Sequence, residues 1–171
     1  MRILGIDPGT IRMGYGVVEG EQELTTLHWG IIKAKSSQPL HERLHCLYGG
    51  LQQIIQSWKP SVVAIEEPFV GREDRQYVQA ALAIGQAQAV ALIVAVEAQT
   101  PIFRYSPALI KKEVADHGAA TKEQVQQMVR VLLNLEETPA PSDAADALGV
   151  AICHWRQQSA RDLLEIAENK A

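Results

Sequence analysis

The spacing of apolar residues changes once along the chain, and this change limits the folds open to it. Residues 2–7, 15–19 and 24–34 form three short, largely apolar runs separated by turn residues, which is typical of β-strands. Their links are too short to carry a crossover helix, so we expect an antiparallel meander. From Leu40 to Trp58 the apolar residues instead recur every three or four positions, as on one face of an amphipathic helix.

Strand-like and helix-like segments alternate after this helix. The predicted elements are a strand at 61–66, a helix at 80–96, a strand at 102–105, a helix opened by Ser106 and Pro107, a helix capped by Thr121 and Gln124, and a helix from Ser142 to about Gln158. This order predicts an α/β fold, a mixed five-stranded sheet flanked by helices. We expect a single domain over residues 1–158 and a short polar C-terminal tail at 159–171.

Two segments rich in small residues are candidates for close packing. Gly49 and Gly50 lie inside the 40–58 helix, where each glycine costs about 1 kcal/mol relative to alanine, so we expect a close contact with another helix there. This helix is also a candidate for a subunit contact, as an alternative to residues 80–96. In residues 80–96 only Gln86 and Gln88 are polar. That run is shorter than the ~20 apolar residues that a bilayer requires, so we expect a buried central helix or a subunit contact and no membrane span.

The charge balance excludes a uniformly basic nucleic-acid binder. The 171 residues contain 16 Lys and Arg against 20 Asp and Glu, a net charge of −4, although a local basic patch depends only on arrangement. Cys46 and Cys153 lie far apart without the spacing of zinc ligands. The opening residues have no features of a secretory signal, so we expect free thiols in a cytoplasmic protein.

Four carboxylates occupy places where α/β folds gather functional residues. Asp7 ends the first strand, Glu66 ends the fourth, and Asp143 and Asp146 lie three residues apart at the start of the last helix. Alternation along the fourth strand does not decide between Glu66 and Glu67. If these elements converge, the clustered charges repel unless a cation neutralises them. Oxygen ligands suit Mg²⁺ or Mn²⁺, and two such ions can activate a water and stabilise the leaving oxygen of a phosphodiester.

Four sequence motifs occur along the chain in the order ILGIDPGTIRMGYGVV, VVAIEEPFV, EQVQQMVRVLL and SDAADALGVAICH. Together they resemble the RuvC-type crossover junction endodeoxyribonucleases, with the resemblance spanning residues 1–156. It implies a ribonuclease-H-like fold and a homodimer that makes paired, symmetric nicks in a four-way (Holliday) DNA junction during recombination and repair, leaving 5′-phosphate and 3′-hydroxyl ends. It also implies dependence on Mg²⁺ or Mn²⁺, with two ions per active site, and the branch-migration proteins RuvA and RuvB as partners.

The resemblance also implies roles for individual residues. The catalytic metal ligands that it implies are Asp7, Glu66, Asp143 and Asp146, which favours Glu66 over Glu67. The DNA-facing residues that it implies are Phe69, which would stack on unpaired bases, and Lys111 and Lys122. A basic patch would add Arg72, Arg75, Arg104 and Lys112. Glu67 and Pro68 depart from the family pattern, and His154, on the last helix, is predicted to be structural.

Other functions stay open at this point. DPGT followed by a glycine-containing turn also resembles the first phosphate loop of actin-like ATP-binding proteins, but no second such loop follows. A non-catalytic junction or RNA binder would have no need of four carboxylates. A related ribonuclease-H-like nuclease acting on RNA precursors shares the DPGT start. The sequence contains nothing that ranks Mg²⁺ against Mn²⁺ or defines a preferred cleavage sequence.

Overall fold

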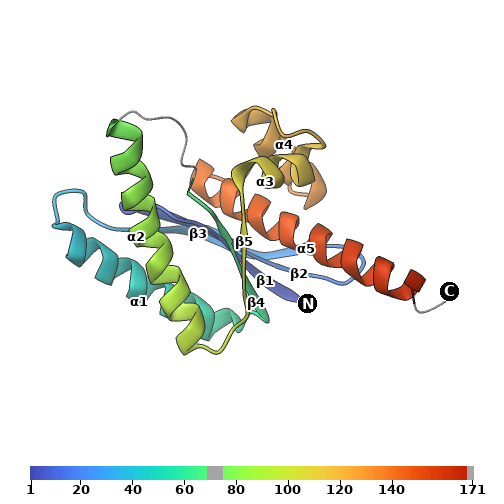
Figure 1. The fold of residues 1–171 in the computed structure, drawn as a ribbon, viewed down its shortest axis with the longest axis horizontal. Coiled ribbons are helices and arrows are strands. Elements are labelled where there is room, and N and C mark those ends of the chain that lie inside the picture. The colour runs from blue at the N-terminus through green and yellow to red at the C-terminus, as the bar shows by residue number, and fades with distance from the viewer. Residues whose placement is uncertain (69–74, 169–171) are drawn as a thin grey trace.

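A single mixed sheet organises the protein in a computed structural model that describes residues 1–68 and 75–168. The strands are β1 (Arg2–Asp7), β2 (Arg12–Glu19), β3 (Thr25–Lys33), β4 (Val62–Glu66) and β5 (Ile102–Tyr105), and the helices are α1 (Leu40–Trp58), α2 (Arg75–Glu97), α3 (Pro107–Ala115), α4 (Lys122–Leu132) and α5 (Ser142–Glu168). The sheet order is β3-β2-β1-β4-β5. β1, β2 and β3 are antiparallel neighbours, whereas β4 and β5 run parallel to β1 (Figure 1).

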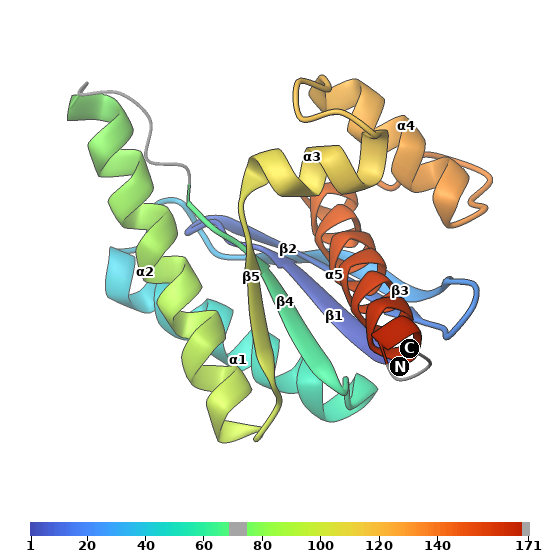
Figure 2. The same cartoon turned by 45° about the vertical axis from the view of Figure 1, so that its right-hand side comes forward.

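Helices cover both faces of the sheet. α1 and α2 lie against one face, and α5 crosses the other face with α3 and α4 packed against it (Figure 2). Successive strand residues point to opposite layers. Leu4 and Ile6 of β1 are buried with α1 and α2, whereas Ile3 is buried with α5. Both layers are therefore apolar, and Asp7 and Glu66 stand where β1 and β4 end.

Most of the predicted elements are confirmed. The antiparallel meander, the helix at 40–58, the strand at 102–105 and the capping box of Thr121 and Gln124 all occur as expected. β2 begins earlier than predicted, at Arg12, because Gly14 is a paired strand residue and not part of the turn. α2 begins at Arg75, and α5 continues through residues 159–168, which the prediction assigned to the tail.

The close contact predicted at Gly49 and Gly50 is made with a strand, so the expected helix–helix contact is wrong. A Cβ atom on Gly50 would lie 2.5 Å from Cγ2 of Ile32 in β3, whereas a Cβ on Gly49 would meet nothing within 4 Å. Gly50 therefore lets α1 approach the sheet. Among the helices that the structure describes, none combines the length and hydropathy needed to cross a membrane.

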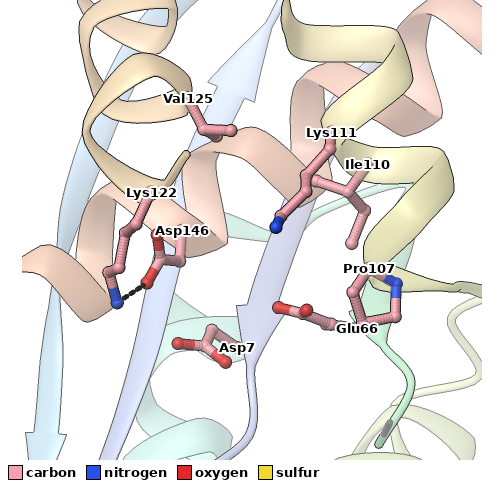
Figure 3. Close-up of a pocket in the computed structure, with 8 residues that line it drawn as sticks. All are labelled: Asp7, Glu66, Pro107, Ile110, Lys111, Lys122, Val125 and Asp146. Atoms are coloured by element: carbon pink, nitrogen blue, oxygen red, sulfur yellow. Dashed lines mark ion pairs between the residues drawn. The ribbon is translucent and has the colours of Figure 1, made fainter. Parts of the chain in front are cut away.

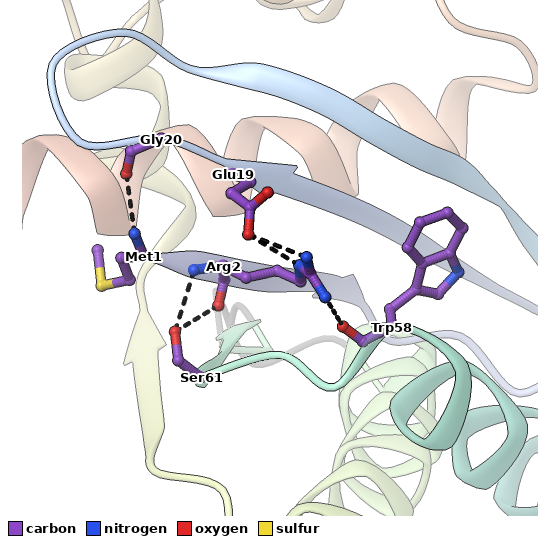
Figure 4. Close-up of polar contacts among 6 residues, drawn as sticks. All are labelled: Met1, Arg2, Glu19, Gly20, Trp58 and Ser61. Carbon is purple, nitrogen blue, oxygen red and sulfur yellow. Dashed lines mark hydrogen bonds and ion pairs between the residues drawn. The ribbon is translucent and has the colours of Figure 1, made fainter.

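Arg2 joins three elements at the beginning of β1 (Figure 4). Its guanidinium group pairs with Glu19 of β2 at 3.0 Å, and Nη1 donates a hydrogen bond of 2.5 Å to the carbonyl oxygen of Trp58 at the end of α1. The Arg2 amide donates to Ser61 Oγ at 3.0 Å, and that hydroxyl donates to the Arg2 carbonyl oxygen at 2.8 Å. These contacts hold the N-terminal ends of the parallel strands β1 and β4 side by side, so their C-terminal ends also lie next to each other.

Candidate active site

Two carboxylates stand where neighbouring parallel strands end. β1 ends at Asp7 and β4 ends at Glu66, and the residues before them, Ile6 and Ile65, are register partners. Ile6 and Ile65 point into the layer of α1 and α2, so Asp7 and Glu66 point to the opposite face, beneath α5. The two carboxylates therefore share one edge and one face of the sheet.

The beginning of α5 carries two further carboxylates to this edge because the strands beneath it have no side chains at the points of contact. A Cβ atom on Gly14 would lie 1.9 Å from the carbonyl oxygen of Asp143, and one on Gly5 would lie 2.1 Å from that of Ala147. The backbone of α5 thus rests directly on β2 and β1, an approach that any side chain at these glycines would block. Asp146 lies within this closely packed segment.

A pocket of about 340 Å³ opens between these elements and is closed on its other side by α3 and α4 (Figure 3). Its lining residues are Asp7, Glu66, Pro107, Ile110, Lys111, Lys122, Val125 and Asp146. Three of the four predicted carboxylates and two of the predicted lysines therefore share one pocket. Asp143 lies outside the lining, with its Oδ2 atom 3.6 Å from Nε of Arg12.

Burial and mutual repulsion make the carboxyl groups of the pocket hard to ionise. Burial, together with the charges of Glu66, Asp146 and Asp143, raises the pKa of Asp7 to about 8 against the opposing effect of Lys122. Burial and the charge of Asp146 likewise raise the pKa of Glu66 to about 7. Such clustering lowers stability at neutral pH, and perturbed groups of this kind concentrate at functional sites.

Lys122 supplies a positive charge to the cluster. Its Nζ atom lies 2.6 Å from Oδ2 of Asp146 (Figure 3). Burial lowers the pKa of Lys122, but the hydrogen bond to Asp146 and the surrounding carboxylates outweigh this effect and hold the pKa above its usual value. Lys111 extends from α3 into the same pocket. The pocket therefore pairs acidic groups on the strands and α5 with basic groups on α3 and α4.

The carboxylates suit a hard divalent cation. They offer only oxygen donors, and the buried Oδ2 atom of Asp143 has no hydrogen-bond partner. Within residues 1–68 and 75–168, no three His, Cys, Asp or Glu side chains already surround one ion position. Lys122 is paired with the carboxylate of Asp146, so a metal ion that binds this carboxylate would have to displace the lysine.

The remaining predicted residues lie apart from the pocket or outside the described structure. Glu67 and Arg104 do not line the pocket and pair with each other at 3.6 Å. Lys112 is exposed on α3 and does not line the pocket. Phe69 and Arg72 lie outside the described residues. Arg75 begins α2, but its side chain also lies outside what the structure describes.

Sequence reasoning missed several residues of the site. Pro107 and Ile110 of α3 and Val125 of α4 form the apolar part of the wall. The helix-start signals of both helices are readable in the sequence, but their position over the pocket depends on tertiary packing. Nothing in the sequence indicated that Arg12 lies beside Asp143.

Comparison with known proteins identifies a family that matches most of the chain. The family model "Crossover junction endodeoxyribonuclease RuvC" matches residues 3–154. A RuvC of Dehalococcoides mccartyi is 48% identical over 165 residues, covering 96% of each chain. A RuvC of Thermomicrobium roseum is 41% identical, covering 95% of this chain and 98% of the relative.

Solved structures agree with the sequence relatives. T. thermophilus RuvC in complex with a Holliday junction substrate superposes with a TM-score of 0.81 at 36% identity, covering 90% of this chain and 92% of the other. The yeast mitochondrial Holliday junction resolvase has the same fold, with a TM-score of 0.59 at 16% identity over 92% of this chain and 80% of the other.

Proposed function

The chain belongs to the RuvC family of crossover junction endodeoxyribonucleases, and from this premise we propose that Asp7, Glu66, Asp143 and Asp146 form its catalytic centre. The protein is an endonuclease of four-way DNA junctions, with a ribonuclease-H-like fold. Family membership over nearly the whole chain does not favour an RNA-precursor nuclease or an actin-like ATP-binding protein. The observation that carries the proposed centre is the meeting of carboxylates from β1, β4 and α5 in one pocket with two lysines.

Asp7, Glu66, Asp143 and Asp146 would hold Mg²⁺ or Mn²⁺, with two ions per site. When bound, the ions supply an activated water and charge stabilisation for the leaving oxygen. The protein's own part is to hold the four carboxyl groups close together, where burial and mutual repulsion disfavour the charged forms of Asp7 and Glu66 in the absence of a cation. Asp7 lies among the other three carboxylates and would contact both ions.

The lysines of the pocket would hold the scissile phosphate and its neighbours. Lys111 and Lys122 extend into the pocket from α3 and α4 (Figure 3), and Lys112 is exposed beside them on α3. Each phosphate neutralised by a lysine releases counterions, so junction binding weakens as salt concentration rises. Phe69, Arg72 and Arg75 would extend this DNA-binding surface by family resemblance, with Phe69 stacking on unpaired bases.

Paired, symmetric nicks require two active sites, and we assign the dimer contact to α2. Among its described side chains, Val78, Leu82, Ile93 and Val96 are apolar and between 46% and 67% exposed. Their spacing places them along one stripe of the helix. A second copy of the chain would bury this stripe by a two-fold contact. RuvA and RuvB are the expected branch-migration partners by family resemblance.

A matched pair of variants tests the catalytic centre. Cleavage of a labelled four-way junction is measured beside a linear duplex of the same sequence, with Mg²⁺, with Mn²⁺ and with EDTA. Glu66→Gln is expected to slow metal-dependent cleavage by about 100-fold or more, with Asp7→Asn behaving alike. Glu67→Gln, one residue away on the other side of the strand, is expected to cleave as the wild type. Wild-type cleavage by Asp7→Asn or Glu66→Gln would overturn the assignment.

A further inference from the structure

A buried hydrogen bond joins Tyr105 to His154 beside the candidate active site. Tyr105 Oη and His154 Nδ1 lie 2.7 Å apart, and the two residues are only 6% and 2% exposed. The ring of Phe103 lies 4.7 Å from that of His154, centroid to centroid. Of the side-chain hydrogen bonds made within the described residues, this is the only one that is fully buried.

Both partners remain neutral across the physiological range. Burial lowers the pKa of His154 to about 4, with a smaller contribution from the charge of Arg161, and burial raises the pKa of Tyr105 to about 12. A neutral phenol and a neutral imidazole form one directional hydrogen bond. Loss of either partner leaves the other with an unsatisfied polar group in an apolar layer.

The bond connects the elements that carry the carboxylates. Tyr105 is the last residue of β5, is the register partner of Glu66, and accepts a hydrogen bond from the Glu67 amide at 2.9 Å. The next residue, Ser106, caps α3, which carries Lys111. His154 lies on α5, the helix that begins with Asp143 and Asp146. This hydrogen bond therefore links β5, which is paired with β4 and continues into α3, to α5.

Among the described residues, the rest of the contact between α5 and the sheet is mainly apolar, apart from the ion pair of Arg12 with Asp143. Ala147 and Ala151 pack over Gly5, and Leu148 packs over Gly16. Such packing resists separation by burial, but it is non-directional and does not by itself fix one position along the helix axis. A hydrogen bond of fixed length and angle does oppose it.

We propose that Tyr105 and His154 are positioning residues that set how far α5 lies along the sheet, and thereby hold Asp143 and Asp146 at the distance from Glu66 at which the carboxylates can share divalent ions. This inference rests on the proposed catalytic centre. Neither residue lines the pocket, so both act through the elements that they join. Outer residues that orient metal ligands typically change metal affinity or activity by about 10–100-fold when they are altered.

Tyr105→Phe tests the proposal because it removes the hydroxyl and retains the ring. Mn²⁺ binding is measured by titration calorimetry, and junction cleavage is followed against Mg²⁺ concentration at a temperature where each variant is folded. Tyr105→Phe is expected to weaken Mn²⁺ binding by about tenfold and to raise the Mg²⁺ requirement of cleavage equally. Junction binding in EDTA is expected to match that of the wild type, because the lysines are unaltered.

Further variants separate a positioning role from an effect on stability and from the catalytic centre itself. Ser61→Ala removes hydrogen bonds to Arg2 at the opposite end of β1 and β4, so it lowers the melting temperature without changing Mn²⁺ binding. His154→Asn, which keeps a polar group near the position of Nδ1, is expected to bind Mn²⁺ more tightly than His154→Ala. Wild-type Mn²⁺ affinity in Tyr105→Phe would overturn the positioning role, whereas wild-type cleavage by Asp7→Asn would instead overturn the proposed centre.

Discussion

The Nζ atom of Lys122 lies 2.6 Å from the Oδ2 atom of Asp146, inside the pocket that Asp7 and Glu66 also line. The lysine therefore occupies a carboxylate that the proposed centre assigns to a metal ion. In the absence of a cation it partly neutralises the cluster. If the proposed centre is correct, a bound metal ion would release the lysine, which could then contact a phosphate of the DNA.

Replacing Lys122 by glutamine removes the competitor of the metal ion. Lys122→Gln is expected to bind Mn²⁺ about fivefold more tightly, which corresponds to about 1 kcal/mol of relieved repulsion. Its cleavage at saturating metal is expected to be slower, because the phosphate loses a positive partner. Titration calorimetry and single-turnover cleavage measure the two effects. Lys112→Gln, exposed and outside the pocket, is the control, and weaker Mn²⁺ binding by Lys122→Gln would contradict the exchange.

Stability of the metal-free protein is expected to fall as pH rises from about 4 to about 8. Asp7 and Glu66 have pKa values of about 8 and about 7 when folded, above their ordinary values of 3.8 and 4.5. Between about pH 4 and 8 for Asp7, and between about pH 4.5 and 7 for Glu66, the folded state retains a proton that the unfolded state has released. Each group therefore costs about 1.4 kcal/mol of unfolding free energy per pH unit within its own window. Urea unfolding in EDTA at several pH values measures the slope.

Two additions identify the source of this slope. Mg²⁺ or Mn²⁺ is expected to flatten the profile, since a bound cation keeps the carboxylates ionised in the folded state. Asp7→Asn is expected to reduce the slope and to be more stable than the wild type in EDTA at pH 8. A flat wild-type profile in EDTA would show that the carboxylates are not held together as described.

Gly14 is expected to be intolerant of even one methyl group. Gly14→Ala would place a Cβ atom 1.9 Å from the carbonyl oxygen of Asp143, so α5 must shift away from the sheet. We expect a loss of about 3 kcal/mol of unfolding free energy together with weaker metal binding. Gly49→Ala, where a Cβ meets nothing, is expected to stabilise α1 by about 0.5–1 kcal/mol. Equal effects at the two glycines in denaturant unfolding would refute the close approach of α5.

The proposed dimer contact through the exposed apolar stripe of α2 can be tested by placing charges on that stripe. Leu82→Glu combined with Ile93→Glu places like charges on both sides of the proposed two-fold contact, so we expect sedimentation as a monomer at micromolar concentration. Paired nicking of a junction is expected to be lost together with the dimer. Val131→Glu, an exposed apolar site on α4, serves as the control and is expected to leave assembly unchanged. A dimeric double variant would place the contact elsewhere.

Residue spacing predicted most of the architecture, because it reflects which side of each element is buried. The helix at 40–58 was predicted to the residue, and the capping box at Thr121 was readable directly. Gly14 was misassigned to a turn because a glycine in a strand and a glycine in a turn look alike until the element that packs on it is known. The same ambiguity led to a helix being expected over Gly50, where β3 lies instead.

The candidate site was less accessible from sequence alone. Val63, Ala64 and Ile65 are all buried, since β4 is covered on both faces, so alternation could not separate Glu66 from Glu67. Tyr105 and His154 had no local signal for their contact, which joins residues far apart in the chain. Such pairings depend on how helices pack onto a sheet, and the spacing of apolar residues does not indicate which side chains of two elements meet.

The order in which the carboxylates occur along the chain has a consequence for how the enzyme is made. Asp7 and Glu66 leave the ribosome early, with the meander and β4, whereas Asp143 and Asp146 come with α5, the last element of the fold. The pocket is therefore incomplete throughout most of translation, and a prematurely terminated product lacks half of the proposed metal ligands. With the proposed ligands, such a nuclease would become able to cut DNA only after α5 has been synthesised.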